Sequence, residues 1–243
     1  YIDFLHTIEK LKCHTRHSWN SEGKRESVAE HSWRLSVMAL LCADEYPELD
    51  MVKVLKMCLI HDFGEAVTGD IPSFYKTADH EQTEARAVRE LVSSLPPDMA
   101  AEFTALYDEM DALETPEAKL FKALDNMEAV VSHNEASLDT WIPLEFTENM
   151  VYGEKAASFS EWTKGLRAEL RRESEEKIRN LKSTMLDYKA LVDGYLKVAD
   201  WRVKENSTVT YSVGGLILSN SGAITANYWL HEIYDDEIAE AHR

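Results

Sequence analysis

Apolar residues recur at three- and four-residue spacing through residues 1–180, with little alternation of apolar and polar positions. That period is typical of amphipathic helices. Clusters of turn residues interrupt it at 20–24, 46–50, 69–73, 95–97 and 141–154. We therefore predict an all-α bundle with helices at Tyr1–Leu11, Val28–Ala43, Met51–Ile60, Thr77–Ser94, Pro97–Met110, Pro116–Ser137 and Phe159–Asn180.

The character of the sequence changes after Asn180. Leu181–Lys197 keeps the helical period, Ser207–Val213 carries β-type residues, and Gly214–Gly222 is rich in Gly and Ser. We expect a helical domain over residues 1–180 and a short C-terminal appendage over residues 181–243, of mixed or irregular structure.

The chain of 243 residues has a formal charge of −18, and its Lys and Arg residues are scattered. This charge argues against binding of a long nucleic acid through its phosphates. A small phosphate substrate is compatible with it when a metal ion supplies the positive charge. We see neither a membrane-spanning run nor a signal peptide, and expect a cytoplasmic protein without membrane attachment.

Two histidines and two aspartates from three predicted helices are candidate metal ligands. His61 and Asp62 follow the apolar helix Met51–Ile60, about 100° apart around its axis, so they can converge on one ion. His31 and Asp125 are flanked by apolar residues that would draw them inward. Taken singly, each could be a hydrogen-bonded or ion-paired core residue. Together they form a nitrogen and oxygen set that suits Mn, Co, Fe, Ni or Zn, whereas Mg prefers oxygen ligands.

The order His…His-Asp…Asp, with spacings of 30 and 63 residues, resembles the HD superfamily of metal-dependent phosphohydrolases. The resemblance covers about residues 4–178. It is closest to the 5′-deoxynucleotidase branch, through ESVAEHS at Glu26–Ser32, HDFGEAVTGDIP at His61–Pro72 and the helix carrying Asp125. It implies an HD-domain helical bundle, a divalent metal, commonly a homodimer, and hydrolysis of deoxyribonucleoside 5′-monophosphates to nucleoside and phosphate.

Two further carboxylates are candidates for catalysis. Glu65 lies four residues after His61, one helical turn on, so its carboxylate can point toward the ligands and act as general acid or base. The matching position of the resembled family is catalytic. Asp70 also matches a family active-site aspartate, and with Glu65 it could bind a second, weaker ion or orient water. Alternatively, Asp70 caps a turn before Pro72.

Candidates for substrate binding are Arg16 and Arg25, since a guanidinium forks well onto phosphate oxygens, and Lys122, one turn before Asp125. Most such side chains in proteins are simply solvated. The resembled 5′-deoxynucleotidases use an adjacent Arg-Trp pair, with the Trp against the sugar. Here two residues separate Arg16 from Trp19, so Trp19 could pack on the ribose or fill the core.

Residues from about 186 to 243 are similar to the start of the catalytic region of anaerobic (class III) ribonucleotide reductases, in DWRVKENSTVTYS and GAITANYWLHEIYDDEIAEAH. The radical-bearing glycine, the active-site cysteines and the barrel of a reductase are not in this sequence. We expect this segment to be non-catalytic. It could dock a reductase-related protein, support dimerisation, or have no role.

We expect a divalent-metal-dependent phosphomonoesterase acting on (deoxy)nucleoside 5′-monophosphates. One alternative is an HD hydrolase of another nucleotide or phosphate ester. A second is a non-catalytic module that senses nucleotides for an anaerobic ribonucleotide reductase. Glu65 favours an enzyme, because a binding module needs no proton-transfer group beside the metal.

Overall fold

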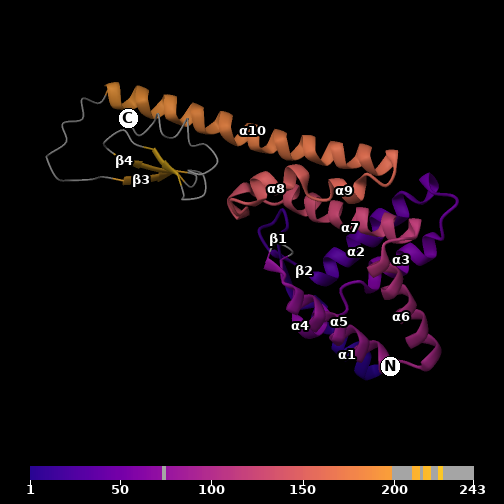
Figure 1. The fold of residues 1–243 in the computed structure, drawn as a ribbon. Coiled ribbons are helices and arrows are strands. Elements are labelled where there is room, and N and C mark those ends of the chain that lie inside the picture. The colour runs from indigo at the N-terminus through magenta and orange to yellow at the C-terminus, as the bar shows by residue number, and fades with distance from the viewer. Residues whose placement is uncertain (73–74, 199–209, 214–215, 220–223, 227–243) are drawn as a thin grey trace. The chain divides into compact units, whose positions relative to one another are not determined.

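The computed structural model describes residues 1–72, 75–198, 210–213, 216–219 and 224–226 (Figure 1). The chain forms two compact units: residues 1–137 with 151–170, and residues 138–150 with 171–243. None of the helices in the described segments has both the length and the hydropathy that crossing a membrane requires.

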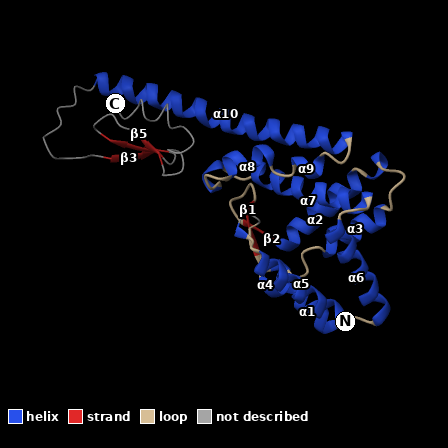
Figure 2. Cartoon of the chain, viewed as in Figure 1, coloured by secondary structure: helices blue, strands red, loops and turns tan. Residues whose placement is uncertain are grey.

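The first unit is mainly helical, which confirms the predicted fold class (Figure 2). Helices α2, α3 and α7 pack against one another, and α6 packs on α3 and α7. The helices of this unit are α1 (Ile2–Ile8), α2 (Val28–Leu41), α3 (Met51–Ile60), α4 (Glu65–Thr68), α5 (Ala78–Ser93), α6 (Pro97–Ala112), α7 (Pro116–Glu135), α9 (Glu154–Ala157) and the first part of α10 (Glu161–Val198), with short 3-10 turns at Glu9–Lys12 and Ala43–Glu45.

The apolar faces of these helices form one core. Its fully buried members include Leu35 on α2, Met57 on α3, and Leu120, Leu124 and Met127 on α7. Removal of this apolar surface from water is the main stabilising contribution to such a bundle. Helix α7 therefore has a fixed position against α2, which carries His31, and against α3, which His61 directly follows.

Side-chain caps fix where the central helices begin. The Ser27 hydroxyl accepts from the Glu30 backbone N–H at 3.2 Å, and the Glu30 carboxylate accepts from the Ser27 N–H at 2.6 Å. Asp50 caps α3 through the Lys53 N–H at 3.0 Å, and Thr115 caps α7. Each cap satisfies backbone donors that the helix leaves open. The capping box at Ser27 places His31 in the second turn of α2.

A β-hairpin interrupts the helical pattern that we predicted through residues 1–180. Strands β1 (Thr15–Trp19) and β2 (Arg25–Ser27) pair antiparallel. Asn20 Oδ1 accepts from the backbone N–H groups of Glu22 and Lys24 at 3.1 and 2.9 Å, and Gly23 has a φ of +77°. Asn and Gly are the residues that tight hairpin turns favour. The hairpin brings β1 against α7.

Two further features bear on the predicted boundaries. Helix α10 includes Leu181–Lys197, which confirms the helical period there, but it runs without a break across Asn180, where we placed a boundary. Helix α8 (Glu145–Val151) lies in the segment predicted as a turn at 141–154. The second unit holds α8, a 3-10 turn at Leu138–Thr140, the C-terminal part of α10 and an antiparallel sheet of β3 (Thr210–Val213), β4 (Leu216–Ser219) and β5 (Ile224–Ala226). Strand β3 lies within Ser207–Val213, the stretch that carries β-type residues.

Candidate metal centre

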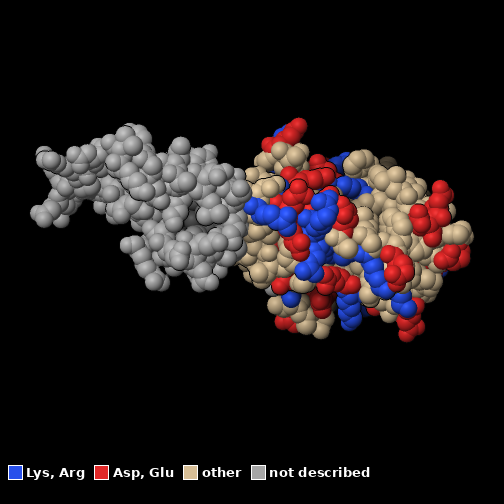
Figure 3. Space-filling model, turned by 90° about the horizontal axis from the view of Figure 1, so that it is seen from above, with Lys and Arg blue, Asp and Glu red and all other residues tan. Residues whose placement is uncertain are grey.

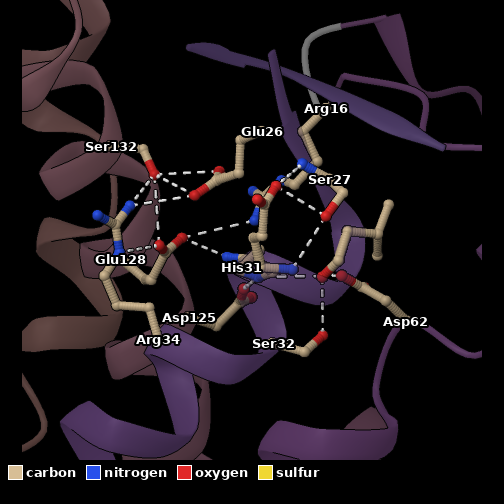
Figure 4. A network of polar contacts seen from close by, with 12 residues as sticks. Arg16, Glu26, Ser27, His31, Ser32, Arg34, Asp62, Asp125, Glu128 and Ser132 are labelled. Atoms are coloured by element: carbon tan, nitrogen blue, oxygen red, sulfur yellow. Dashed lines mark hydrogen bonds and ion pairs between the residues drawn. The ribbon is translucent and has the colours of Figure 1, made fainter. Parts of the chain in front are cut away.

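The four predicted ligands lie close together in the first unit, and Figure 4 labels three of them, His31, Asp62 and Asp125. His31 comes from α2, His61 and Asp62 from the turn after α3, and Asp125 from α7. The two imidazole Nε2 atoms lie 3.3 Å apart. Asp62 Oδ2 lies 3.1 Å from His61 Nε2, and Asp125 Oδ1 lies 3.3 Å from His31 Nε2.

In each imidazole ring, the Nδ1 atom, which points away from the other candidate ligands, already has a hydrogen-bond partner. His61 Nδ1 donates to the Cys58 carbonyl at 3.0 Å, and His31 Nδ1 donates to the Glu128 carboxylate. When these rings are neutral, both Nε2 atoms therefore carry lone pairs that face each other and two carboxylates. Such a set of acceptors requires a proton or a cation among them.

The spacing of these atoms fits a divalent ion. A ligand distance of about 2.1 Å places neighbouring ligand atoms about 3.0–3.4 Å apart in octahedral or tetrahedral geometry. The separations of 3.1 and 3.3 Å fall in that range, and the other two, His61 Nε2 to Asp125 Oδ1 and His31 Nε2 to Asp62 Oδ2, are 3.7 and 3.9 Å. The ligand atoms of His31, His61 and Asp62 all lie within 4.8 Å of one another. The donors therefore fit a divalent metal, whose identity they do not select.

Charges in the cluster explain its protonation states. Burial opposes ionisation of both aspartates, but His61, His31 and Arg16 hold the pKa of Asp62 well below its usual range. Lys122 and the two histidines do the same for Asp125. Burial and Arg16 lower the pKa of His31, yet Glu128 and Asp125 outweigh them and raise it to about 9. In the absence of an ion, a proton on His31 therefore partly balances the two carboxylates.

A buried polar network lies behind His31 (Figure 4). The Glu128 carboxylate is 0 % exposed and also accepts from Arg34 Nε at 2.6 Å. Arg34 further contacts Glu26 and Ser132. Burial opposes ionisation of Glu128, but His31, Arg16 and Arg34 hold its pKa at about 2. Sequence reasoning missed this network, although Arg34 follows His31, and Glu128 follows Asp125, by three residues on one helix face.

The four-residue spacing from His61 suggested that Glu65 continues α3. In the structure, Glu65 instead begins the separate helix α4. The intervening chain is wound more tightly: Phe63 N–H bonds the Ile60 carbonyl at 2.9 Å, and Glu65 N–H bonds the Asp62 carbonyl at 3.0 Å. Gly64 permits a close approach to α5, since a Cβ there would lie 2.7 Å from Glu84 Cγ. These turns place Glu65 near the charge of Asp62.

The Glu65 carboxylate is buried, with 4 % of the residue exposed. Its Oε2 atom has no hydrogen-bond partner among the described residues. Burial, followed by the charges of Asp62, Asp70 and Glu84, raises the pKa of Glu65 to about 10. In the protein without an ion, Glu65 therefore holds a proton at neutral pH.

Asp70 lies in the loop after α4 and is partly buried. Burial, together with the charge of Asp62, raises its pKa, while Arg16 and Lys76 oppose the shift. Asp70 therefore belongs electrostatically to the same acidic cluster as Asp62 and Glu65.

Two of the predicted substrate-binding residues lie beside the ligands. Arg16 on β1 is 16 % exposed, with Nη1 3.5 Å from the Glu128 carboxylate, and its charge acts on Asp62 and Asp125. Lys122 Nζ donates to Asp125 Oδ2 at 2.8 Å, which leaves Oδ1 for the side facing His31. Lys122 thus contacts a candidate ligand directly.

The other two predicted substrate-binding residues form a separate pair on the hairpin. Arg25 and Trp19 are register partners, and the Arg25 guanidinium carbon lies 5.3 Å from the Trp19 ring centroid. A cation over an indole face is a favourable contact in its own right. The structure therefore brings Arg16 and Lys122 to the cluster and pairs Arg25 with Trp19.

Basic and acidic side chains are interspersed on the face of the described chain shown in Figure 3. The formal charge of the whole chain is −18. Attraction of a phosphate must therefore come from groups at the cluster itself, such as Arg16, and from a bound cation.

A family model and two related proteins point to the same protein family. A family model described as HD domain matches residues 8–167. The chain is 31 % identical over 145 residues to 5′-deoxynucleotidase HDDC2 of Dictyostelium discoideum, covering 56 % of this chain and 76 % of that protein. It is 32 % identical over 138 residues to the Bos taurus protein of the same name, covering 55 % and 66 %.

A solved structure gives the same result. A predicted metal-dependent phosphohydrolase from Magnetospirillum magnetotacticum MS-1 is 36 % identical, with a TM-score of 0.62, over 73 % of this chain and 91 % of that one. These findings give no support to the similarity of residues 186–243 to a reductase. Many residues that carry that similarity, at 199–209, 220–223 and 227–243, lie outside the described residues.

The protonation of His31 predicts how metal binding depends on pH. An ion bound at Nε2 must displace a proton from a group with a pKa of about 9. Below that pH, each unit of decrease should lower the apparent Mn²⁺ affinity up to about tenfold. Isothermal titration calorimetry in buffers of different ionisation enthalpy measures the proton released. Equal affinity and no proton release at pH 6.5 and 8.5 would contradict the assignment of His31 as a ligand.

Proposed function

The chain belongs to the HD-domain family of metal-dependent phosphohydrolases, and we propose that it hydrolyses nucleoside 5′-monophosphates, preferring the deoxy forms, to nucleoside and phosphate. One observation carries the proposal: two imidazoles and two ionised carboxylates converge beside Arg16 and the protonated Glu65. The preference for deoxynucleotides rests on the relatives named 5′-deoxynucleotidases.

His31, His61, Asp62 and Asp125 would hold the divalent ion. When bound, that ion supplies positive charge at the phosphoryl group and activates water for attack. The mixed donor set suits Mn, Co, Fe, Ni or Zn better than Mg. Lys122 keeps Asp125 ionised and oriented through its bond to Oδ2.

Arg16 is positioned to bind the phosphate. Its side chain is partly exposed, its charge acts on two of the candidate ligands, and its contact with Glu128 involves Nη1. A guanidinium has five N–H donors, so the others can donate to phosphoryl oxygens. Arg16 would thereby orient the phosphorus toward the attacking water and neutralise charge on the transferred group.

Glu65 would transfer the proton that the leaving group needs. Hydrolysis forms a bond from a water oxygen to phosphorus and breaks the bond from phosphorus to O5′. The leaving alkoxide takes the proton from Glu65, and a proton of the attacking water restores the acid. A carboxyl with a pKa raised to about 10 is protonated at neutral pH, and a bound cation opposes that shift.

A second, weaker ion fits beside Glu65 and Asp70 in this scheme. The charge of Asp70 opposes ionisation of Glu65, and the charge of Asp62 opposes ionisation of both. A cation would relieve that repulsion. With that second ion bound, Glu65 would be ionised; it would first take a proton from the attacking water as a base and then give that proton to the leaving alkoxide.

A cleft of about 700 Å³ adjoins the cluster and offers room for the nucleoside. His61 and Lys122 lie in its wall next to the cluster, and Gln82, Ala85 and Arg89 of α5 line another part. Small-molecule sites typically measure about 300–1,000 Å³. We place the phosphate beside Arg16 and the nucleoside in this cleft.

Replacing Glu65 tests the reaction. Glu65→Gln keeps the shape of the side chain but cannot give up a proton, so kcat for phosphate release from deoxynucleoside 5′-monophosphates should fall about 10²–10⁴-fold. The matched control is Glu90→Gln on the exposed part of α5, which should keep wild-type kcat. Both would be assayed with Mn²⁺ and Co²⁺. Wild-type kcat in Glu65→Gln, or no phosphate release by folded, metal-loaded wild type, would contradict the proposal.

Filling the cleft tests where the nucleoside lies. Ala85→Trp should lower kcat/KM for a deoxynucleoside monophosphate at least about tenfold, or about 1.4 kcal/mol, through lost room for the nucleoside. Hydrolysis of p-nitrophenyl phosphate, a smaller ester, should change less. Arg86→Trp, at the exposed neighbouring position, is the control. An equal loss for both esters would place the nucleoside elsewhere.

A further inference from the structure

Two carboxylates of α7 face the two nitrogens of the His31 ring, which α2 carries. Asp125 on α7 lies 3.3 Å from Nε2, and Glu128, one turn further along α7, accepts from Nδ1. The ring itself is 1 % exposed. A metal-binding imidazole whose second nitrogen bonds a carboxylate has a fixed tautomer, a fixed plane and greater basicity.

The Glu128 carboxylate is itself held in place. Its Oε1 accepts from Arg34 Nε at 2.6 Å and lies 3.3 Å from the Ser132 hydroxyl. Arg34 stands one turn after His31 on α2, as Glu128 stands one turn after Asp125 on α7. His31 and Arg34 of α2 therefore contact Asp125 and Glu128 of α7. Rotation of the His31 ring would break its contacts with both carboxylates.

The same carboxylate also reaches the hairpin. Glu128 Oε2, the atom that bonds His31, lies 3.5 Å from Arg16 Nη1. Glu128 is 0 % exposed, so its carboxylate is shielded from bulk water. Loss of the Glu128 carboxylate would leave His31 Nδ1 and Arg34 Nε without their charged acceptor.

We propose that Glu128 is a positioning residue, held by Arg34, that sets the His31 ring for the metal and Arg16 for the phosphate. The inference rests on the proposed metal site. Glu128 need not touch metal or substrate to do this. It ties a ligand from α2 and an arginine from β1 to one point on α7.

Glu128→Gln tests this role with a readout independent of catalysis. A Gln amide offers one oxygen where His31 and Arg34 each present a donor, so Mn²⁺ affinity measured by calorimetry without substrate should fall about 10–100-fold. The absorption spectrum of the Co²⁺-loaded protein should change as well. At saturating Mn²⁺, inhibition by inorganic phosphate should weaken, because Arg16 loses its partner. Wild-type Mn²⁺ affinity and Co²⁺ spectrum in a folded Glu128→Gln protein would overturn the proposal.

The control is Glu135→Gln. Glu135 is the other carboxylate that Arg34 bonds from α7, and its side chain is 49 % exposed. Its loss should leave Mn²⁺ affinity close to that of the wild type. An equal fall in both variants would show that general loss of negative charge explains the effect, and would overturn a positioning role for Glu128.

A measurement on the wild-type protein covers the case in which Glu128→Gln does not fold. In ¹⁵N-histidine spectra of the Zn²⁺-loaded protein, His31 should coordinate through Nε2 and keep its proton on Nδ1. Coordination through Nδ1 would overturn the proposal. Should these tests succeed while no nucleotide is hydrolysed, the proposed substrate fails and the positioning role stands. Absence of divalent binding by wild type would reject both.

Discussion

His31 and His61 present their Nε2 atoms to each other at 3.3 Å, with the ionised Asp62 and Asp125 beside them. Lone pairs and negative charges at this spacing repel one another, so the arrangement is stable only with positive charge between them. In the protein without an ion, the raised pKa of His31 supplies part of that charge. A divalent ion would supply it more completely, and the surrounding structure holds the candidate ligands at distances that suit one.

Several kinds of local structure hold the two imidazoles and two carboxylates close together. The capping box of Ser27 and Glu30 fixes the start of α2, and the Cys58 carbonyl orients His61 after α3. Helix α7 contributes Asp125 to one side of the His31 ring and Glu128 to the other. The hairpin then places Arg16 against the same carboxylate. A site built from one point on each of several packed elements depends on the packing of the core that joins them.

The helical period predicted most of the bundle, and α3 has the bounds expected for it, Met51–Ile60. The hairpin was not predicted, although Asn20 and Gly23 are typical turn residues. Its strands are too short for an alternation of apolar and polar residues to be recognised. The four ligand candidates could be chosen from their order and apolar flanks. Glu128 and Arg34 could not, because a charged residue on a helix is usually solvated and only tertiary packing buries these two. The homodimer and the cytoplasmic location stay predictions.

The most direct test of this account is to locate the ion. Crystals grown with Mn²⁺ would be measured with X-rays near the manganese absorption edge, and an anomalous difference map calculated. The account predicts a strong peak about 2.0–2.3 Å from His31 Nε2, His61 Nε2 and oxygens of Asp62 and Asp125. A peak bound through other residues, with these four side chains still bonded to one another, would contradict it.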